Sequence, residues 1–65
     1  MRQNLIAERK LNNLTQEHTA IKIGVTVRHY QALEAGTSKG SVDVWEKLRN
    51  LFNKSIDYLL EQESN

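Results

Sequence analysis

The segment Thr15–Gly36, TQEHTAIKIGVTVRHYQALEAG, constrains the fold more than any other part of the chain. Thr15 and Thr26 each stand where a helix N-cap is preferred, because a threonine oxygen accepts a hydrogen bond from a free N–H of the first turn. Gly24 lies between the two helices that these caps begin, and glycine readily adopts the left-handed conformation that ends a helix. Ala20 is small enough to let the helices approach closely. The segment therefore predicts two short helices joined by a tight turn, a helix-turn-helix.

The rest of the chain has the pattern of further short helices. The whole chain contains no proline and only three glycines, and no alternating run rich in β-branched residues predicts a strand. We expect helices over about 2–12, 16–23, 27–35, 42–52 and 56–62, with the helix-turn-helix at 15–35 and residues 63–65 frayed. The fourth helix has the clearest apolar stripe, formed by Val44, Trp45, Leu48, Leu51 and Phe52. The prediction is one compact all-α domain over residues 1–65.

Length and composition exclude several classes of protein. At 65 residues the chain is near the lower limit for a domain that folds on its core alone. It has no cysteine, so neither a disulfide framework nor a thiolate metal site is available, and the chain suits a reducing cytoplasm. No apolar run approaches a membrane span, and the first residues lack the apolar region of a signal peptide. We therefore expect a soluble, cytoplasmic protein with no membrane partner.

The charges are distributed unevenly, although the net charge is only +1. Residues 1–41 contain six basic and three acidic residues, a balance of +3, whereas residues 42–65 contain three basic and five acidic residues, a balance of −2. The N-terminal part is therefore the better suited to meet a polyanion. A random scatter of so few charges is the alternative interpretation.

The predicted third helix has two distinct sides. At about 100° per residue, Tyr30 and Leu33 fall on one side, which we expect to pack inward. The outward side collects small apolar groups and two strong hydrogen-bonding groups, namely Val27, Arg28, Gln31 and Ala32. Such a surface is suited to the major groove of DNA, where a recognition helix reads base edges.

Each outward residue type has a partner in that groove. Arg28 can donate a bidentate pair to guanine, and Gln31 can pair with adenine or with a phosphate. Val27 or Ala32 can contact a thymine methyl group. Gln16 and Thr26 stand at helix N-termini, where side chains and backbone N–H groups bind phosphate.

A solvated helix face is the simpler interpretation of an isolated arginine and glutamine. Within a complete helix-turn-helix frame, DNA reading becomes the better one.

The chain resembles the Cro and phage-repressor family of helix-turn-helix domains, also called XRE-type. The motif residues are LTQE, then Ala20, Gly24-Val25 and LEAG at the family's spacing, and ERK, GTSKGSVDVW and SIDYLL extend the match over nearly the whole chain. The resemblance implies a five-helix lambda-repressor-like fold, operator binding and frequent dimerisation.

The resemblance also assigns roles to individual residues. It places a phosphate-binding glutamine at Gln16, and a basic loop after the recognition helix at Lys39. An ion pair between the first and third helices falls on Arg9 and Glu34, with a structural role. The groove-reading positions are Val27, Arg28 and Ala32, with Gln31 adjacent.

Three residues depart from the family pattern. Thr19 replaces a larger aliphatic residue, Ile21 is apolar where a polar residue is common, and Glu8 occupies a place that is often apolar. We expect local repacking of the second helix.

The sequence offers no arrangement typical of an enzyme or a cofactor site. His18 and His29 have no partners at metal-ligand spacing, so we expect no metal. Asp57 and Glu61 are better explained as a solvated acidic face than as a catalytic pair. No glycine-rich phosphate loop and no activated nucleophile is present.

Two functions remain. The first is a sequence-specific DNA-binding transcriptional regulator of a prokaryote or phage, associated with the nucleoid. We interpret it as a repressor that binds a two-fold symmetric operator as a homodimer, with half-sites roughly 34 Å apart. The predicted dimer contacts are those of Tyr58, Leu59 and Leu60 that the core does not bury.

The second function is an antitoxin or protein-binding module of the same fold, with Leu11 and Ile21 as anchors for a toxin or anti-repressor.

Overall fold

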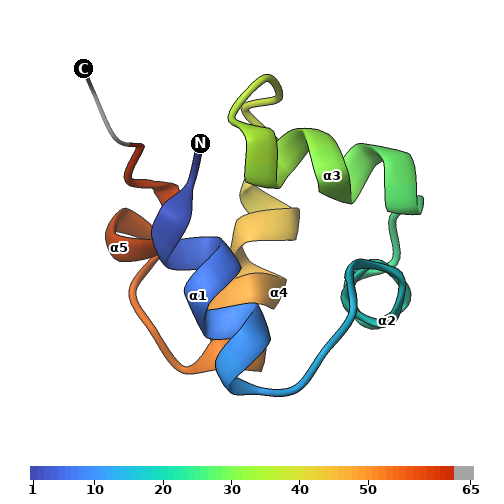
Figure 1. Cartoon of the computed structure of the whole chain (residues 1–65). Coiled ribbons are helices and arrows are strands. Elements are labelled where there is room, and N and C mark those ends of the chain that lie inside the picture. The colour runs from blue at the N-terminus through green and yellow to red at the C-terminus, as the bar shows by residue number, and fades with distance from the viewer. Residues whose placement is uncertain (63–65) are drawn as a thin grey trace.

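The computed structural model describes residues 1–62, which form five α-helices and no strand (Figure 1). The helices are α1 (Gln3–Leu11), α2 (Gln16–Ile23), α3 (Val27–Ala35), α4 (Val42–Phe52) and α5 (Ile56–Leu60). The all-α prediction is confirmed for this part of the chain. The expected fraying of residues 63–65 lies outside the described residues.

The helix boundaries follow from short polar side chains and from left-handed residues. Thr15 and Thr26 accept hydrogen bonds from the backbone N–H groups of His18 and His29, at 3.0 and 3.1 Å. Gly24 ends α2 at a φ of 75°. The predicted caps and the turn of the helix-turn-helix are therefore all present.

The fifth helix is shorter than predicted, since α5 ends at Leu60 and not at Gln62. Glu61 has an extended ψ of 132°, which takes the chain out of the helix. The Leu60 carbonyl accepts a hydrogen bond from Arg2 Nε at 3.3 Å, so a side chain from the other end of the sequence binds the helix terminus.

A single apolar core lies between the helices. In Figure 1, α4 lies behind α1, with α5 to one side and the α2–α3 pair to the other. Of the predicted α4 stripe, Leu51 is only half-buried. The buried apolar residues are Leu5, Ala20, Ile23, Tyr30, Leu33, Val44, Trp45, Leu48, Phe52 and Leu59.

Arg2 is buried in a way that the sequence did not predict. Its side chain is 4% exposed and lies over the Trp45 ring, 5.0 Å from the centroid. One guanidinium nitrogen donates to the carbonyls of Leu33 at 2.6 Å and Ser38 at 2.8 Å. These carbonyls and that of Leu60 lie at or near the C-terminal ends of α3 and α5, where a cation is favourable. Arg2 therefore joins both chain ends to α3, although burial lowers its pKa.

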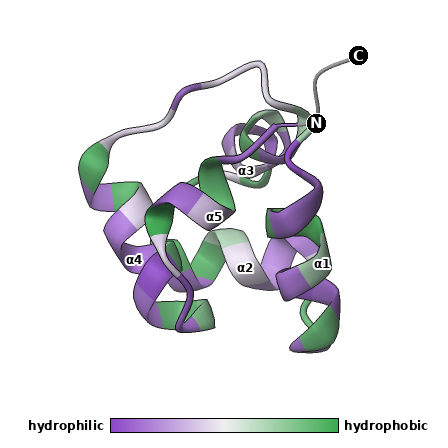
Figure 2. Cartoon of the chain, turned by 90° about the vertical axis from the view of Figure 1, so that its left-hand side faces the viewer, coloured by the Kyte–Doolittle hydropathy of each residue, from purple (hydrophilic) through white to green (hydrophobic). Residues whose placement is uncertain are grey.

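Every helix contains both hydrophilic and hydrophobic residues (Figure 2). Some large apolar side chains remain exposed, among them Leu11, Ile21 and Val42. Among residues 1–62, no helix combines the length and apolarity needed to cross a bilayer.

Candidate nucleic-acid interface

The two sides of α3 separate largely as the sequence predicts. Tyr30 and Leu33 are fully buried, and Arg28 and Gln31 are exposed. Ala32 is half-buried, so its methyl group is only partly accessible. Arg28 and Gln31 are therefore the strongly polar groups of the predicted reading surface.

Val27 does not face outward as the sequence predicts, because its side chain is half-buried and packs against the core. It is the first residue of α3, and helical side chains lean toward the N-terminal end, which here points at α2. Val27 lines a shallow hollow of about 320 Å³ together with Thr15, Gln16, Glu17 and Gln31. Val27 therefore lies at the base of the hollow between α2 and α3, and only part of its side chain is accessible to a ligand.

A polar network joins α1, α2 and α3 beside this hollow. Arg9 Nε donates to Glu34 Oε2 at 2.6 Å, which forms the predicted ion pair. Gln16 Nε2 donates to the other carboxylate oxygen, Glu34 Oε1, at 2.9 Å. Gln31 Nε2 in turn donates to Gln16 Oε1 at 3.1 Å. The network therefore runs from the buried ion pair to the exposed face of α3.

The inner end of the network is largely shielded from solvent. The side chains of Arg9 and Glu34 are 12% and 4% exposed. The hydrogen bond to Glu34 raises the pKa of Arg9, so the guanidinium stays charged. Burial, together with the Glu34 carboxylate, raises the pKa of Tyr30 and keeps its phenol neutral. The inner end of the network is thus the ion pair of Arg9 and Glu34, and the Gln16 amide is hydrogen-bonded to its carboxylate.

The N-termini of α2 and α3 remain accessible beside the network. Thr15 and Thr26 are exposed and use their hydroxyl oxygens as caps. A hydroxyl that accepts a hydrogen bond can still donate its proton. Thr26 can therefore serve as a cap and donate to an anion at the same time.

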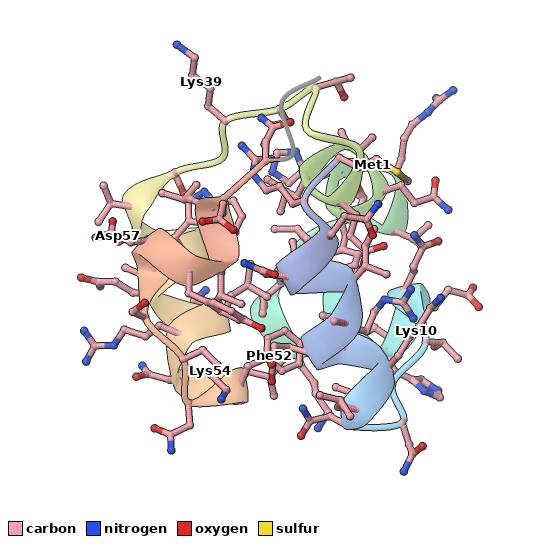
Figure 3. The ribbon with its side chains drawn as sticks, turned by 60° about the vertical axis from the view of Figure 1, so that its left-hand side comes forward. Met1, Lys10, Lys39, Phe52, Lys54 and Asp57 are labelled. Carbon is pink, nitrogen blue, oxygen red and sulfur yellow. The ribbon has the colours of Figure 1, made fainter. Side chains whose placement is uncertain are left out.

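Lys39 lies in the loop between α3 and α4. Figure 3 shows its side chain pointing away from the body of the protein. The Lys39 carbonyl accepts a hydrogen bond from the Trp45 indole nitrogen at 2.7 Å. The backbone is thereby fixed while the ammonium group remains in solvent, an arrangement suited to a phosphate contact.

The model of the family described as helix-turn-helix matches residues 5–59 of this chain. The chain belongs to the Cro and phage-repressor, or XRE-type, helix-turn-helix family. Its α2, turn and α3 are the family's DNA-binding element, and the resemblance drawn from LTQE, Gly24 and LEAG is confirmed.

Two curated proteins of Bacillus subtilis (strain 168) are similar to this helix-turn-helix domain. The uncharacterized HTH-type transcriptional regulator YqaE is 38% identical over 63 residues, which cover 97% of this chain and 54% of YqaE. The uncharacterized HTH-type transcriptional regulator YobD is 38% identical over 58 residues, which cover 89% of this chain and 52% of YobD. The chain thus spans about half the length of the curated relatives it matches. No solved structure gives a significant match.

Sequence reasoning missed the contacts between Gln16, Gln31 and Glu34 in this helix-turn-helix. Gln16 and Gln31 are 15 residues apart on different helices, so no periodic pattern relates them. The family frame identified Gln16 only as a phosphate anchor. Its contact with Gln31 depends on how α2 packs across α3, and the residue pattern within one helix does not predict that packing.

The departures from the family pattern have local explanations. Thr19 is buried, and its hydroxyl donates to the Thr15 carbonyl at 2.9 Å. Glu8 is only 6% exposed, and its carboxylate accepts a hydrogen bond from the Tyr58 hydroxyl at 3.2 Å. Ile21 is 76% exposed and contributes little to the core.

The predicted dimer contacts divide into one core residue and two surface residues. Leu59 is fully buried, so it cannot contact a second copy. Tyr58 is 37% exposed, and half-buried Leu60 lines an apolar hollow of about 380 Å³ with Val42, Ile56 and Trp45. Leu59 is therefore the residue of the three that the core buries, and the dimer contact stays a prediction for Tyr58 and Leu60.

Among residues 1–62, no three acidic or histidine side chains gather as a metal site would require. His18 and His29 take part in the helix caps, because their backbone N–H groups donate to Thr15 and Thr26.

Proposed function

We propose that this domain is the sequence-specific DNA-binding part of a transcriptional regulator, a repressor that occupies a two-fold symmetric operator as a homodimer. The observation that carries the proposal is the exposed pair Arg28 and Gln31 on α3, within a helix-turn-helix whose helix N-termini remain accessible. The names of the two relatives, both HTH-type transcriptional regulators, support the regulatory role. The proposal includes no catalytic step and no cofactor, and places the protein in the cytoplasm on the nucleoid.

Base reading is assigned to α3. Arg28 donates to the two acceptors that guanine presents in the major groove, and Gln31 contacts a neighbouring base. Ala32 offers part of its methyl group to a thymine, and Val27, being half-buried, contributes only at its edge.

Anchoring to the DNA backbone is assigned to three other side chains. Gln16 and Thr26 stand at the N-terminal ends of α2 and α3, and Lys39 extends from the loop after α3. Phosphate contacts of this kind fix register and make affinity depend on salt.

The homodimer is proposed to form around the surface of Tyr58 and Leu60. Exposed Val42, at 72% exposure, lies beside the same apolar hollow as Leu60 and extends the apolar surface. For such a dimer to bind the operator, its two-fold contact must place the two α3 helices roughly 34 Å apart, on successive turns of one face of the duplex.

A selection from random duplex DNA tests the proposal. We expect an enriched motif with two-fold symmetry and half-sites about one helical turn apart, with affinity that falls steeply with salt. Recovery of unrelated sequences would contradict sequence-specific binding. A single, unsymmetrical half-site would contradict the homodimer while leaving DNA binding in place.

The exposure of Leu11 and Ile21, at 75% and 76%, favours a second candidate, a protein-binding module such as an antitoxin. Substituting both by serine should abolish binding to a toxin or anti-repressor expressed with the protein and leave DNA binding unchanged. Unchanged binding to that partner would remove this candidate.

A further inference from the structure

We propose that Arg2 and Trp45 hold the α3–α4 loop (residues 36–41) in the conformation in which Lys39 binds a DNA phosphate. The inference rests on the proposed function, which assigns Lys39 as a phosphate contact. It adds two positioning residues that lie outside the loop and influence DNA affinity without touching DNA.

Two successive carbonyl groups of the loop accept hydrogen bonds from side chains of the interior. Arg2 Nη1 donates to the Ser38 carbonyl at 2.8 Å, and the Trp45 indole nitrogen donates to the Lys39 carbonyl at 2.7 Å. These carbonyls belong to the two peptide planes that flank the Lys39 Cα, and each peptide plane is rigid. The two hydrogen bonds together therefore fix the direction in which the Lys39 side chain leaves the backbone.

The two donors are themselves held in place by the core. Arg2 and Trp45 are each 4% exposed, and the guanidinium carbon lies 5.0 Å from the centroid of the indole ring. Arg2 also donates to the carbonyls of Leu33 at 2.6 Å and Leu60 at 3.3 Å. The loop therefore cannot move away from these donors without losing contacts to the interior.

The backbone of the loop lies directly against the same tryptophan. Gly40 has a φ of 71°, and a Cβ atom at this position would lie 2.7 Å from Trp45 Nε1 and 2.9 Å from Leu33 Cδ2. Such distances leave no space for a side chain. The close approach at Gly40 therefore holds the residue after Lys39, as the hydrogen bonds hold the planes on either side of it.

Lys39 itself remains accessible to DNA. It is exposed, and its side chain points away from the body of the protein (Figure 3). Because the free protein already orders the loop, DNA binding does not have to order it, and preorganisation of this kind raises affinity. Arg2 is almost completely buried, so its influence on DNA passes through Lys39.

Double-mutant cycles of DNA affinity test the proposal, on the motif that the native protein selects and at a temperature where circular dichroism shows each variant folded. Arg2→Met should weaken binding by about the same factor as Lys39→Ala and lower the slope of log affinity against log salt by about 1. In the Arg2→Met background, Lys39→Ala should then have little further effect. The matched control combines Arg2→Met with Arg28→Ala, at the other end of α3, and these two losses should add.

A second variant keeps the test informative if Arg2→Met does not fold. Trp45→Phe keeps an aromatic ring in the core but removes the N–H that binds the Lys39 carbonyl. It should show the same loss of additivity with Lys39→Ala, and additivity with Arg28→Ala.

Each other result overturns the proposal. Additive losses with Lys39→Ala in both backgrounds would show that Arg2 and Trp45 only stabilise the fold. A salt slope that falls by about 1 for Arg2→Met and by a further 1 for the double variant would show that Arg2 binds phosphate itself. Equal loss of additivity with Lys39→Ala and with Arg28→Ala would show a general distortion of the domain.

A measurement without DNA separates failure of this inference from failure of the proposed function. In ¹⁵N relaxation of the free protein, we expect the backbone amides of residues 38–40 to be less ordered in Arg2→Met and Trp45→Phe than in the native protein. The exposed control Arg49→Met should match the native protein. Unchanged order in both variants would overturn the inference whatever the protein binds. Native protein that enriches no DNA motif would instead overturn the proposed function, and the assignment of Lys39 with it.

Discussion

The two ends of α3 are both held by polar groups but differ in what they expose. At the C-terminal end, the Arg2 guanidinium is buried against the Leu33 and Ser38 carbonyls and the Trp45 ring. At the N-terminal end, the Thr26 cap and the following Arg28 lie in solvent. A helix carries partial positive charge at its N-terminus and partial negative charge at its C-terminus. The buried cation covers the negative end, and the positive end remains available to an anion.

The difference shows how a small domain combines stability with a binding surface. The buried end adds hydrogen bonds that tie residue 2 to the region of residues 33–38 and to Leu60. The open N-terminal end continues into the exposed face of α3. There a network runs from the buried ion pair at Glu34, in the last turn of the helix, through Gln16 to the exposed Gln31 amide. Substitutions at the two ends should therefore separate stability from base reading.

Arg2→Met should give the largest effect, a loss of about 3 kcal/mol in the free energy of unfolding. The apolar stem is kept, but the buried carbonyls lose a charged donor, and unpaired buried groups are costly. Urea unfolding measures the loss, with exposed Arg49→Met on α4 as the control that changes it by less than about 0.5 kcal/mol. Equal stability of the two variants would contradict a structural role for Arg2.

Arg9→Met should destabilise the domain by about 2 kcal/mol, because it leaves the Glu34 carboxylate buried without its cation. The loss is smaller than for Arg2, since Gln16 still donates to that carboxylate. Combining Arg9→Met with Glu34→Leu should recover part of the stability, as measured by a double-mutant cycle. Strict additivity of the two losses would show that the pair contributes nothing as a pair.

Arg28→Ala belongs to the open end and should leave the unfolding free energy within about 0.5 kcal/mol of the native value. Its affinity for the selected DNA should fall by about 1–3 kcal/mol, with relaxed preference at one G·C pair in each half-site. Gel shifts at two salt concentrations measure this, with Arg49→Ala as the matched control. If Arg28→Ala binds like Arg49→Ala, α3 is not the reading helix.

Lys39→Ala should have the smallest effect. We expect affinity to fall by a similar factor on every sequence, and the slope of log affinity against log salt to decrease by about 1. Lys10→Ala, an exposed lysine on α1, serves as the control. A changed sequence preference without a changed slope would mean that Lys39 reads bases instead of binding phosphate.

Most of the fold was predictable because it depends on local rules. The caps Thr15 and Thr26, the left-handed Gly24 and the spacing of Tyr30 and Leu33 act within one or two helical turns, and each is present. The Arg9–Glu34 pair was also predictable, although only through the family resemblance. The predicted facing of α3 is incomplete at Val27 and Ala32, which are both half-buried; Val27 packs against the core.

The sequence by itself determined the helices, the turn between α2 and α3, and which side of α3 carries Arg28 and Gln31. Only the tertiary structure decided that Arg2 is buried, that Leu59 belongs to the core, and that Gln16 and Gln31 share a hydrogen bond. Helix caps and periodicity depend on neighbours along the chain, whereas these three features depend on groups 15 to 58 residues away. Their partners are known only once the helices are packed.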